Sequence, residues 1–312
     1  MAVYQRLFQR GELQTRVQQA LAILENCHLC PRCCGVNRLA GETGECCTGR
    51  QALVSSFGPH YGEETPLVGS GGSGTIFFTY CNLRCCFCQN YAISQLGEGY
   101  KVEATDLAEM MLSLQERGCH NINLVSPTHV VPQILEALEI ALESGLFIPL
   151  VYNSGGFDSV ETLRLMDGVI DIYMPDMKYS DEQNSQRFSE VKDYSRHNRA
   201  AVREMYRQVG DLVIDDLGVA SHGLLVRHLV LPFRLAGTEE ICKFLSQEIS
   251  TNTYLNIMSQ YHPCYKASNV TELARSPSDN EFSEAVKIAG DCGLKRLDRI
   301  ETRRLAIMHR IL

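Results

Sequence analysis

Short apolar runs typical of buried β-strands alternate with amphipathic segments through most of the chain. Within residues 106–117 and 132–144 the apolar side chains recur every three or four residues, which places them on one face of a helix. Pro132 near the start and Gly145 after the end agree with a helix over 132–144. Further helices are predicted over 184–209, 239–249 and 279–289. The predicted strands are TIFFTY, NINLVS, IPLVYNS, DIYMPDMK, LLVRHLVLP and TYLNIMSQY.

This alternation predicts an α/β domain built on a parallel sheet. About 230 residues remain after the N-terminal region, which is short for a full eight-stranded barrel. We therefore expect a partial, incomplete TIM-like barrel of about six parallel strands, with an open doubly wound sheet as the alternative. In both folds ligands bind at the carboxyl ends of the strands.

The first part of the chain has a different composition. Residues 27–60 are rich in Cys and Gly with little periodic apolar pattern, which is typical of a small module stabilised by metal. We predict an N-terminal segment with this Cys-rich module over residues 1–68, and a core with a C-terminal helical extension over 69–312. Apolar residues at helical spacing among the arginines of 295–310 predict a helix with one solvated face.

Composition narrows the class of protein. The 312 residues are 45% hydrophobic, which is enough for a sizeable core. A formal net charge of -8 disfavours a broad nucleic-acid surface. No apolar run reaches the ~18 residues of a membrane span, and the first residues lack a secretory apolar region. We expect a cytoplasmic protein that binds neither membrane nor nucleic acid.

Ten of the fourteen cysteines lie between Cys27 and Cys88, in close spacings that favour metal ligation over disulfide bonds. Cys81, Cys85 and Cys88 directly follow the first predicted strand, where a loop can direct three thiolates to one side. Spacing alone also allows a zinc site or buried thiols. The CxxxCxxC spacing of Cys81, Cys85 and Cys88 does not include Cys86, which we expect to be a packing or spectator thiol.

The segment TYCNLRCCFCQN, residues 79–90, resembles the CxxxCxxC motif of the radical S-adenosylmethionine (radical SAM) superfamily, with Phe87 at the usual aromatic position. CHLCPRCCGVNRLAGETGEC, residues 27–46, is similar to the N-terminal half of uncharacterised relatives of pyruvate formate-lyase activating enzyme. The resemblance extends from Cys27 to about His262.

This resemblance implies a 4Fe-4S cluster on the three cysteines. Three protein ligands on four irons leave one iron open for another ligand, here S-adenosylmethionine. One electron passed from the cluster would cleave the cofactor and give a 5'-deoxyadenosyl radical. The implied partners are an electron donor such as flavodoxin or ferredoxin and an unknown protein or small-molecule substrate.

The resemblance also implies that polar residues at the strand ends approach the cofactor. Carboxylates accept hydrogen bonds from ribose hydroxyls or an amino group, and cationic side chains pair with the methionine carboxylate. Salt bridges or hydrogen bonds that close the barrel are the alternative role. The residues are Ser126, Asn153, Ser154, Asp176, Lys178, Arg227 and His262.

The segment after the second predicted strand departs from the activating enzymes, many of which have Gly-Gly-Glu there to bind the cofactor's amino group. Here Ser126 and Thr128 supply hydroxyl groups that can accept from the same amine. His129 is either a substrate contact or an ordinary residue at a helix start.

Cys27, Cys30, Cys34 and Cys46 form a second set of four thiols, with Cys33 and Cys47 as neighbouring alternates. Four thiolates suit either a closed tetrahedral zinc site or an auxiliary iron-sulfur cluster. Reactive or buried thiols without metal are the alternative.

Three functions remain open at this stage. The first is an enzyme that uses the radical on another molecule, including a protein glycine as in the activating enzymes. The second is radical modification of a small metabolite or peptide. The third is a non-catalytic iron-sulfur or zinc protein that carries electrons or acts as a scaffold, which needs neither a polar cavity nor an open iron.

Overall fold

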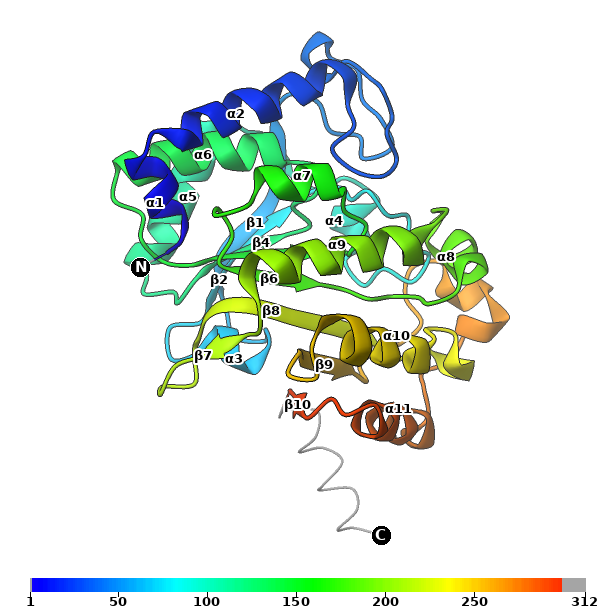
Figure 1. Cartoon of the computed structure of the whole chain (residues 1–312). Coiled ribbons are helices and arrows are strands. Elements are labelled where there is room, and N and C mark those ends of the chain that lie inside the picture. The colour runs from blue at the N-terminus through cyan, green and yellow to red at the C-terminus, as the bar shows by residue number, and fades with distance from the viewer. Residues whose placement is uncertain (1, 299–312) are drawn as a thin grey trace.

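The computed structural model describes residues 2–298, and ten strands within this range form one mostly parallel sheet (Figure 1). Its strands follow the order β10-β9-β8-β6-β5-β4-β2-β1-β3, and β7 pairs with β8. Along this order all neighbours from β2 to β10 are parallel, whereas β1 and β3 extend the β2 edge in antiparallel fashion and β7 pairs antiparallel with β8. The bounds are β1 Ala52–His60, β2 Ser73–Phe78, β3 Tyr100–Val102, β4 Ile122–Val125, β5 Leu150–Ser154, β6 Ile172–Pro175, β7 Val213–Ile214, β8 Ala220–Leu229, β9 Tyr254–Met258 and β10 Arg296–Leu297.

The six predicted strands correspond to β2, β4, β5, β6, β8 and β9, and the predicted parallel α/β sheet is confirmed. These strands lie side by side in chain order. A doubly wound sheet reverses its strand order near the middle, so that alternative is wrong. Within the described residues the sheet is open, with β3 and β10 at its two ends.

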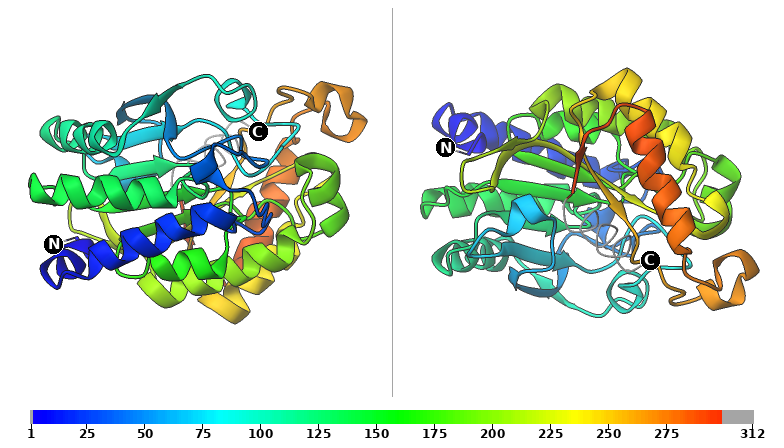
Figure 2. Two further views of the ribbon diagram at one scale, coloured as in Figure 1. Left: turned by 90° about the horizontal axis from the view of Figure 1, so that it is seen from above. Right: turned by 90° about the horizontal axis from the view of Figure 1, so that it is seen from below.

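A row of helices covers one face of the sheet, where α6, α2, α7 and α9 contact one another in that order (Figures 1 and 2). Of the six predicted helices, three are found as α5, α6 and α11. The predicted helix over 184–209 is divided into α8 and α9, and that over 239–249 begins as α10 and ends in a π-helical turn. The bounds are α1 Tyr4–Gln9, α2 Glu12–Ala22, α3 Thr65–Val68, α4 Tyr91–Ser94, α5 Ala104–Glu116, α6 Val131–Glu143, α7 Val160–Leu165, α8 Glu182–Ser189, α9 Tyr194–Val209, α10 Thr238–Phe244 and α11 Asp279–Asp291.

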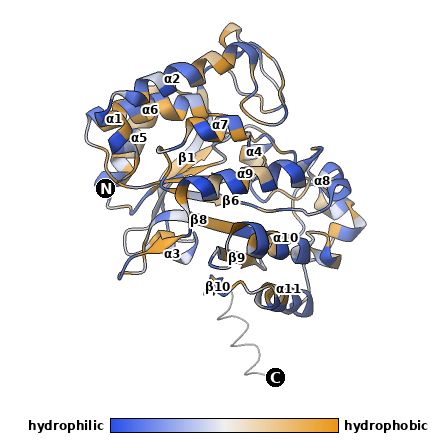
Figure 3. Cartoon of the chain, in the orientation of Figure 1, coloured by the Kyte–Doolittle hydropathy of each residue, from blue (hydrophilic) through white to orange (hydrophobic). Residues whose placement is uncertain are grey.

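Side chains of each strand alternate between the helices and the opposite face of the sheet. On β5, Leu150 and Tyr152 join the main core beneath the helices, whereas Val151 joins a smaller apolar cluster on the other face. Leu67 of α3 closes that cluster at one end. Figure 3 shows the result for a neighbouring pair: β8 is largely hydrophobic, and α9, which contacts it, is largely hydrophilic. The opposite face also carries polar side chains, among them the buried Thr75 of β2 and Asn123 of β4.

The N-terminal helices belong to the main core. Leu13, Val17 and Ala20 of α2 are buried in the same cluster as the strands, and the Tyr4 hydroxyl donates to the carbonyl of Ile148 at 2.6 Å. Strand β1 also pairs with β2. Residues on the two sides of the predicted boundary at 68/69 therefore share one sheet and one hydrophobic core.

The predicted helix over 295–310 is wrong at its start. Arg296 and Leu297 form β10, which pairs with Tyr254 and Leu255 of β9. Pairing with β9 satisfies backbone hydrogen-bonding groups of Arg296 and Leu297, which a helix would withdraw from the sheet. Residues 299–310 of that segment lie outside the described residues. Among residues 2–298, no helix combines the length and apolar character that a bilayer crossing requires.

We expect Leu13→Ala to destabilise the whole chain, because Leu13 is 1% exposed within the shared core. Truncation of a buried leucine costs about 2 to 5 kcal/mol. Urea unfolding followed by circular dichroism should show one transition at a lower midpoint. Leu217→Ala, at a side chain that is 86% exposed, is the matched control and should leave the midpoint unchanged. A separate early transition for Leu13→Ala would show that residues 1–68 unfold as an independent unit.

Candidate functional site

A cavity of about 250 Å³ lies at the carboxyl ends of the parallel strands. It is lined by both thiols and polar strand-end side chains, with Leu83, Phe87, Leu229 and Met258 as apolar walls. Nine of the ten residues predicted for the cluster and cofactor lie together here: Cys81, Cys85, Cys88, Ser126, Asn153, Ser154, Asp176, Lys178 and Arg227.

The three thiols come from the loop after β2 and each has a polar neighbour. The sulfur of Cys85 lies 2.9 Å from the Ser189 hydroxyl, and that of Cys88 lies 3.0 Å from the Ser94 hydroxyl. The sulfur of Cys81 accepts from the backbone N–H of Leu83 at 3.4 Å. Hydrogen bonds of this kind stabilise an anionic sulfur.

Cys86 does not line the cavity. Its backbone is fixed on both sides, since its N–H donates to Phe188 O at 2.8 Å and its carbonyl accepts from Lys266 N at 2.9 Å. The structure therefore directs the thiols of Cys85 and Cys88 into the cavity and leaves out the cysteine between them.

Asp176 lies between two cations. Its Oδ2 is 2.5 Å from Lys178 Nζ, and its Oδ1 accepts from Arg227 Nε at 2.8 Å. Burial acts to raise the pKa of Asp176, but the charges of Arg227 and Lys178 outweigh burial and hold that pKa below its usual value. Asp176 therefore stays ionised and positions both cations at the cavity wall.

Arg227 has two further partners. Its Nη2 donates to Asn153 Oδ1 at 2.7 Å, and its Nη1 lies 3.7 Å from Glu64 Oε1. Glu64 also accepts from Asn256 Nδ2 at 3.1 Å. Glu64 precedes α3 and was not expected at the site from the sequence.

Asp158 is a buried carboxylate behind the cavity. It accepts hydrogen bonds from Thr128 at 2.6 Å, Tyr152 at 3.0 Å and Ser154 at 2.7 Å. Thr128 is thus directed toward Asp158 and does not line the cavity, whereas Ser126 does. Ser126 has a positive φ of 61° and donates its N–H to Asn153 O at 2.8 Å.

Two predicted histidines lie outside the cavity lining. His262 is exposed, and its Nδ1 lies 3.2 Å from Gln260 O and 3.4 Å from the amide of Gln89. His129 is buried two residues before α6, with Nε2 at 3.0 Å from Thr79 O. Burial, and then the charge of Arg38, lowers the pKa of His129 to about 4.

Comparison with known proteins identifies the family. The model of the radical SAM superfamily matches residues 75–227, a range that contains the three cysteines and the polar strand ends except His262. A protein of Methanocaldococcus jannaschii, the uncharacterised protein MJ0674, is 32% identical over 288 residues, which cover 89% of this chain and 78% of that protein. The chain belongs to the radical SAM superfamily.

A solved radical SAM methyltransferase from Sphaerobacter thermophilus has the same fold, with a TM-score of 0.51 and 13% identity. The similarity covers 71% of this chain and 64% of that protein. At this identity the match concerns the fold, an α/β arrangement with a mostly parallel sheet.

Membership of the superfamily implies a 4Fe-4S cluster and S-adenosylmethionine, and the cysteines of the cavity fit the cluster. Burial raises the pKa of Cys81 to about 11 and that of Cys85 to about 12, so their ionisation requires positive charge nearby, which iron supplies. Lys178 acts on Cys85 in the same direction. Among the described residues, no three Cys, His, Asp or Glu side chains are arranged to hold a single metal ion.

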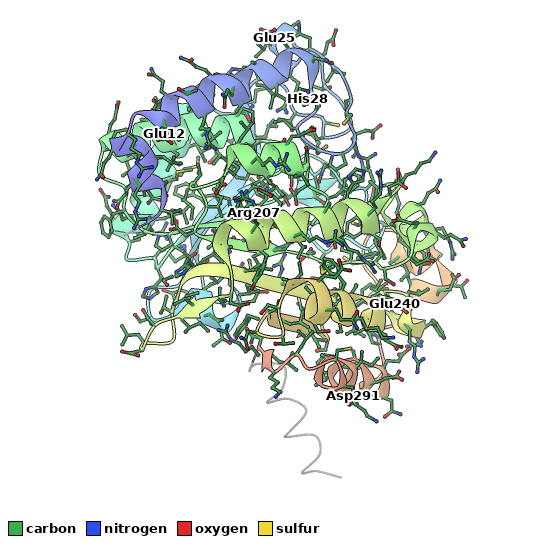
Figure 4. The ribbon with its side chains drawn as sticks, viewed as in Figure 1. Glu12, Glu25, His28, Arg207, Glu240 and Asp291 are labelled. Carbon is green, nitrogen blue, oxygen red and sulfur yellow. The ribbon has the colours of Figure 1, made fainter. Side chains whose placement is uncertain are left out.

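The other cysteine set follows α2, near the labelled Glu25 and His28 in Figure 4. It lines a second, smaller cavity with Asn82 and His129. The neighbouring Cys47 is exposed and lies 3.6 Å from an Arg84 nitrogen. The thiols at this cavity are Cys27, Cys30, Cys33, Cys34 and Cys46.

Sequence reasoning missed the residues that support the radical SAM site from other elements. Ser94 belongs to α4, six residues after Cys88, and Ser189 lies at the end of α8, far from any motif in the sequence. Asp158 follows the predicted strand end Asn153-Ser154 by four residues, so a search for acids just beyond strand ends could have found it. Nothing in the sequence indicates that Glu64 faces Arg227.

We expect Asp176→Asn to reduce stability by about 3 to 5 kcal/mol at neutral pH, because it leaves buried cations without their partner. The folded pKa of Asp176 is lowered, so its contribution is present above the unfolded pKa of about 3.9 and is lost as pH falls through the folded value. The difference between the wild type and Asp176→Asn should therefore shrink as pH falls below about 4.

Urea unfolding at a series of pH values measures this difference. Asp216→Asn, at an exposed turn residue, is the control and should track the wild type at every pH. A difference for Asp176→Asn that stays constant through the acid range would contradict the assignment.

Proposed function

We propose that this radical SAM protein uses the cavity to cleave S-adenosylmethionine reductively and to abstract hydrogen from a separate substrate. When bound, the cluster on Cys81, Cys85 and Cys88 supplies the electron for that cleavage. The observation that supports this is the convergence of three thiols and the polar ends of four successive parallel strands on one cavity. A non-catalytic electron carrier requires no such cavity.

The side chains around the cavity have distinct roles in the proposal. Lys178 and Arg227, held by Asp176, provide positive charge for the methionine carboxylate. Ser126 and the amide of Asn153 offer hydrogen bonds to the amino group or the ribose. Ser154 is directed to Asp158 and acts chiefly by fixing the end of β5.

Apolar walls have a protective role. Leu83 and Phe87 lie on the cysteine side of the cavity, and Leu229 and Met258 on the side of β8 and β9. Excluding water from this region limits side reactions of a radical before it meets its substrate.

The substrate is proposed from the resemblance to activating enzymes. In this proposal the sheet is a partial barrel, the Cys-rich region is an added module, and the hydrogen is taken from a glycine in the backbone of another protein. A flavodoxin or ferredoxin supplies the electron. Radical modification of a small metabolite or peptide is the competing outcome.

Anaerobically reconstituted and reduced protein is expected to form 5'-deoxyadenosine from S-adenosylmethionine. Cys85→Ala should abolish this product, because Cys85 lies in the cavity with a buried thiol. Cys86→Ala, one residue away and outside the cavity, is the matched control and should retain it. Chromatography of the nucleoside products gives the measurement, and a fully loaded, reduced wild type without product would refute the proposal.

If the substrate is a protein, the hydrogen that the radical abstracts comes from the protein fraction of the cell. Cells of the source organism grown in deuterated medium yield a lysate that can be separated by size into protein and small-molecule fractions. With the reduced enzyme, the protein fraction should transfer deuterium to 5'-deoxyadenosine, as seen by mass spectrometry. Transfer only from the small-molecule fraction would favour the competing outcome.

A further inference from the structure

Four cysteine thiols of the N-terminal loop are close to one another and separate from the radical SAM cysteines. They are Cys27, Cys30, Cys34 and Cys46, and none of them lines the cavity of the radical SAM cysteines. All four line a cavity of about 10 Å³, close to the smallest space that admits a water molecule. Cys33 also borders this cavity but is exposed, with its sulfur 3.6 Å from Cys30 O.

The backbone of this loop is shaped around the thiols. Cys27 donates its N–H to Val36 O and accepts from Gly35 N–H, each at 3.0 Å, which closes the loop. A Cβ at Gly44 would lie 2.6 Å from the sulfur of Cys34. Only glycine at position 44 therefore allows Cys34 its observed place.

A buried cation beside the thiols points to a negatively charged occupant. Arg38 is 1% exposed and, among the described residues, forms no ion pair with a carboxylate. Its nitrogens donate to the carbonyls of Gly49 and His129 at 2.8 to 3.1 Å and lie 4.0 Å from the sulfur of Cys27. A buried charge without an opposite charge is costly, and metal-bound thiolates would supply that charge.

Four thiols can hold either zinc or an iron-sulfur cluster. In residues 2–298 the N-terminal thiols are not arranged around a single metal ion. The radical SAM cysteines, which the superfamily assigns to a cluster, share that property.

The two cysteine sets meet at Asn82. Asn82 lines the same cavity as the N-terminal thiols, and its backbone carbonyl accepts from Arg32 Nε at 2.6 Å. Asn82 directly follows Cys81 in the chain, so the two sets are separated by little more than one residue.

We propose that Cys27, Cys30, Cys34 and Cys46 bind a second iron-sulfur cluster with four protein thiolates, and that Arg38 balances its charge. Four protein ligands leave no iron open, so this cluster transfers electrons or stabilises the loop and does not bind S-adenosylmethionine.

Removing each cysteine set separately tests the proposal by metal content, independently of S-adenosylmethionine cleavage. Each variant is reconstituted anaerobically with iron and sulfide, and iron, sulfide and zinc are measured per chain. The Cys81→Ala/Cys85→Ala/Cys88→Ala variant should retain iron and acid-labile sulfide at the N-terminal site. Cys27→Ala/Cys30→Ala should lose that portion and retain the radical SAM cluster. Absence of iron from the first variant, or zinc in place of iron, would overturn the proposal.

Neighbouring residues provide matched controls in the chain that lacks the radical SAM cysteines. Cys34→Ala should lose the iron, whereas Cys33→Ala and Cys47→Ala should keep it. Gly44→Ala should reduce iron content, because the added methyl group meets the sulfur of Cys34. Full iron retention in Cys34→Ala with loss in Cys33→Ala would refute the ligand assignment. A folded protein in each case is verified by circular dichroism.

Discussion

The buried ion pairs of Asp176 with Lys178 and Arg227 are the interaction on which the site depends. Asp176 and Arg227 lie opposite each other where β6 and β8 end, and Arg227 reaches across to Asn153 on β5. Charges at this depth are stable only when each has a partner. A shift of β8 relative to β6 would separate them, so the sheet register and the charge pattern at the cavity determine each other.

Two cations, Lys178 and Arg227, share the carboxylate of Asp176 at the cavity wall. Arg227 also lies 3.7 Å from Glu64 Oε1, and burial raises the pKa of Glu64 despite the opposing effect of Arg227. The charge of Lys178 acts to lower the pKa of Cys85, and the hydroxyls of Ser189 and Ser94 lie within hydrogen-bond distance of the sulfurs of Cys85 and Cys88. One electrostatic arrangement thus suits both thiolates and a bound carboxylate.

The sequence predicted what local pattern determines. The six strands and the helices α5, α6 and α11 follow from apolar periodicity, and parallel order places polar strand ends such as Asn153 and Asp176 at one edge. It did not predict the incorporation of α1 and α2 into the main core, because an amphipathic helix does not specify the surface that it covers. It also missed Ser189 and Glu64, whose roles arise from contacts between distant segments. At Arg296 and Leu297 the helical spacing of apolar residues does not produce a helix. These residues pair with β9, and that pairing is possible only in the assembled sheet.

The N-terminal loop and the radical SAM loop are linked through Asn82. Its backbone carbonyl accepts from Arg32 Nε at 2.6 Å, and its side chain donates to Phe157 O at 2.7 Å. Since Cys81 precedes Asn82 directly, the contact with Arg32 connects the position of Cys81 to the N-terminal loop. Metal binding at the N-terminal thiols would therefore restrict the radical SAM loop, and such restriction lowers the conformational cost of assembling three thiolates around a cluster. This coupling gives the Cys-rich segment a structural role even if it transfers no electrons.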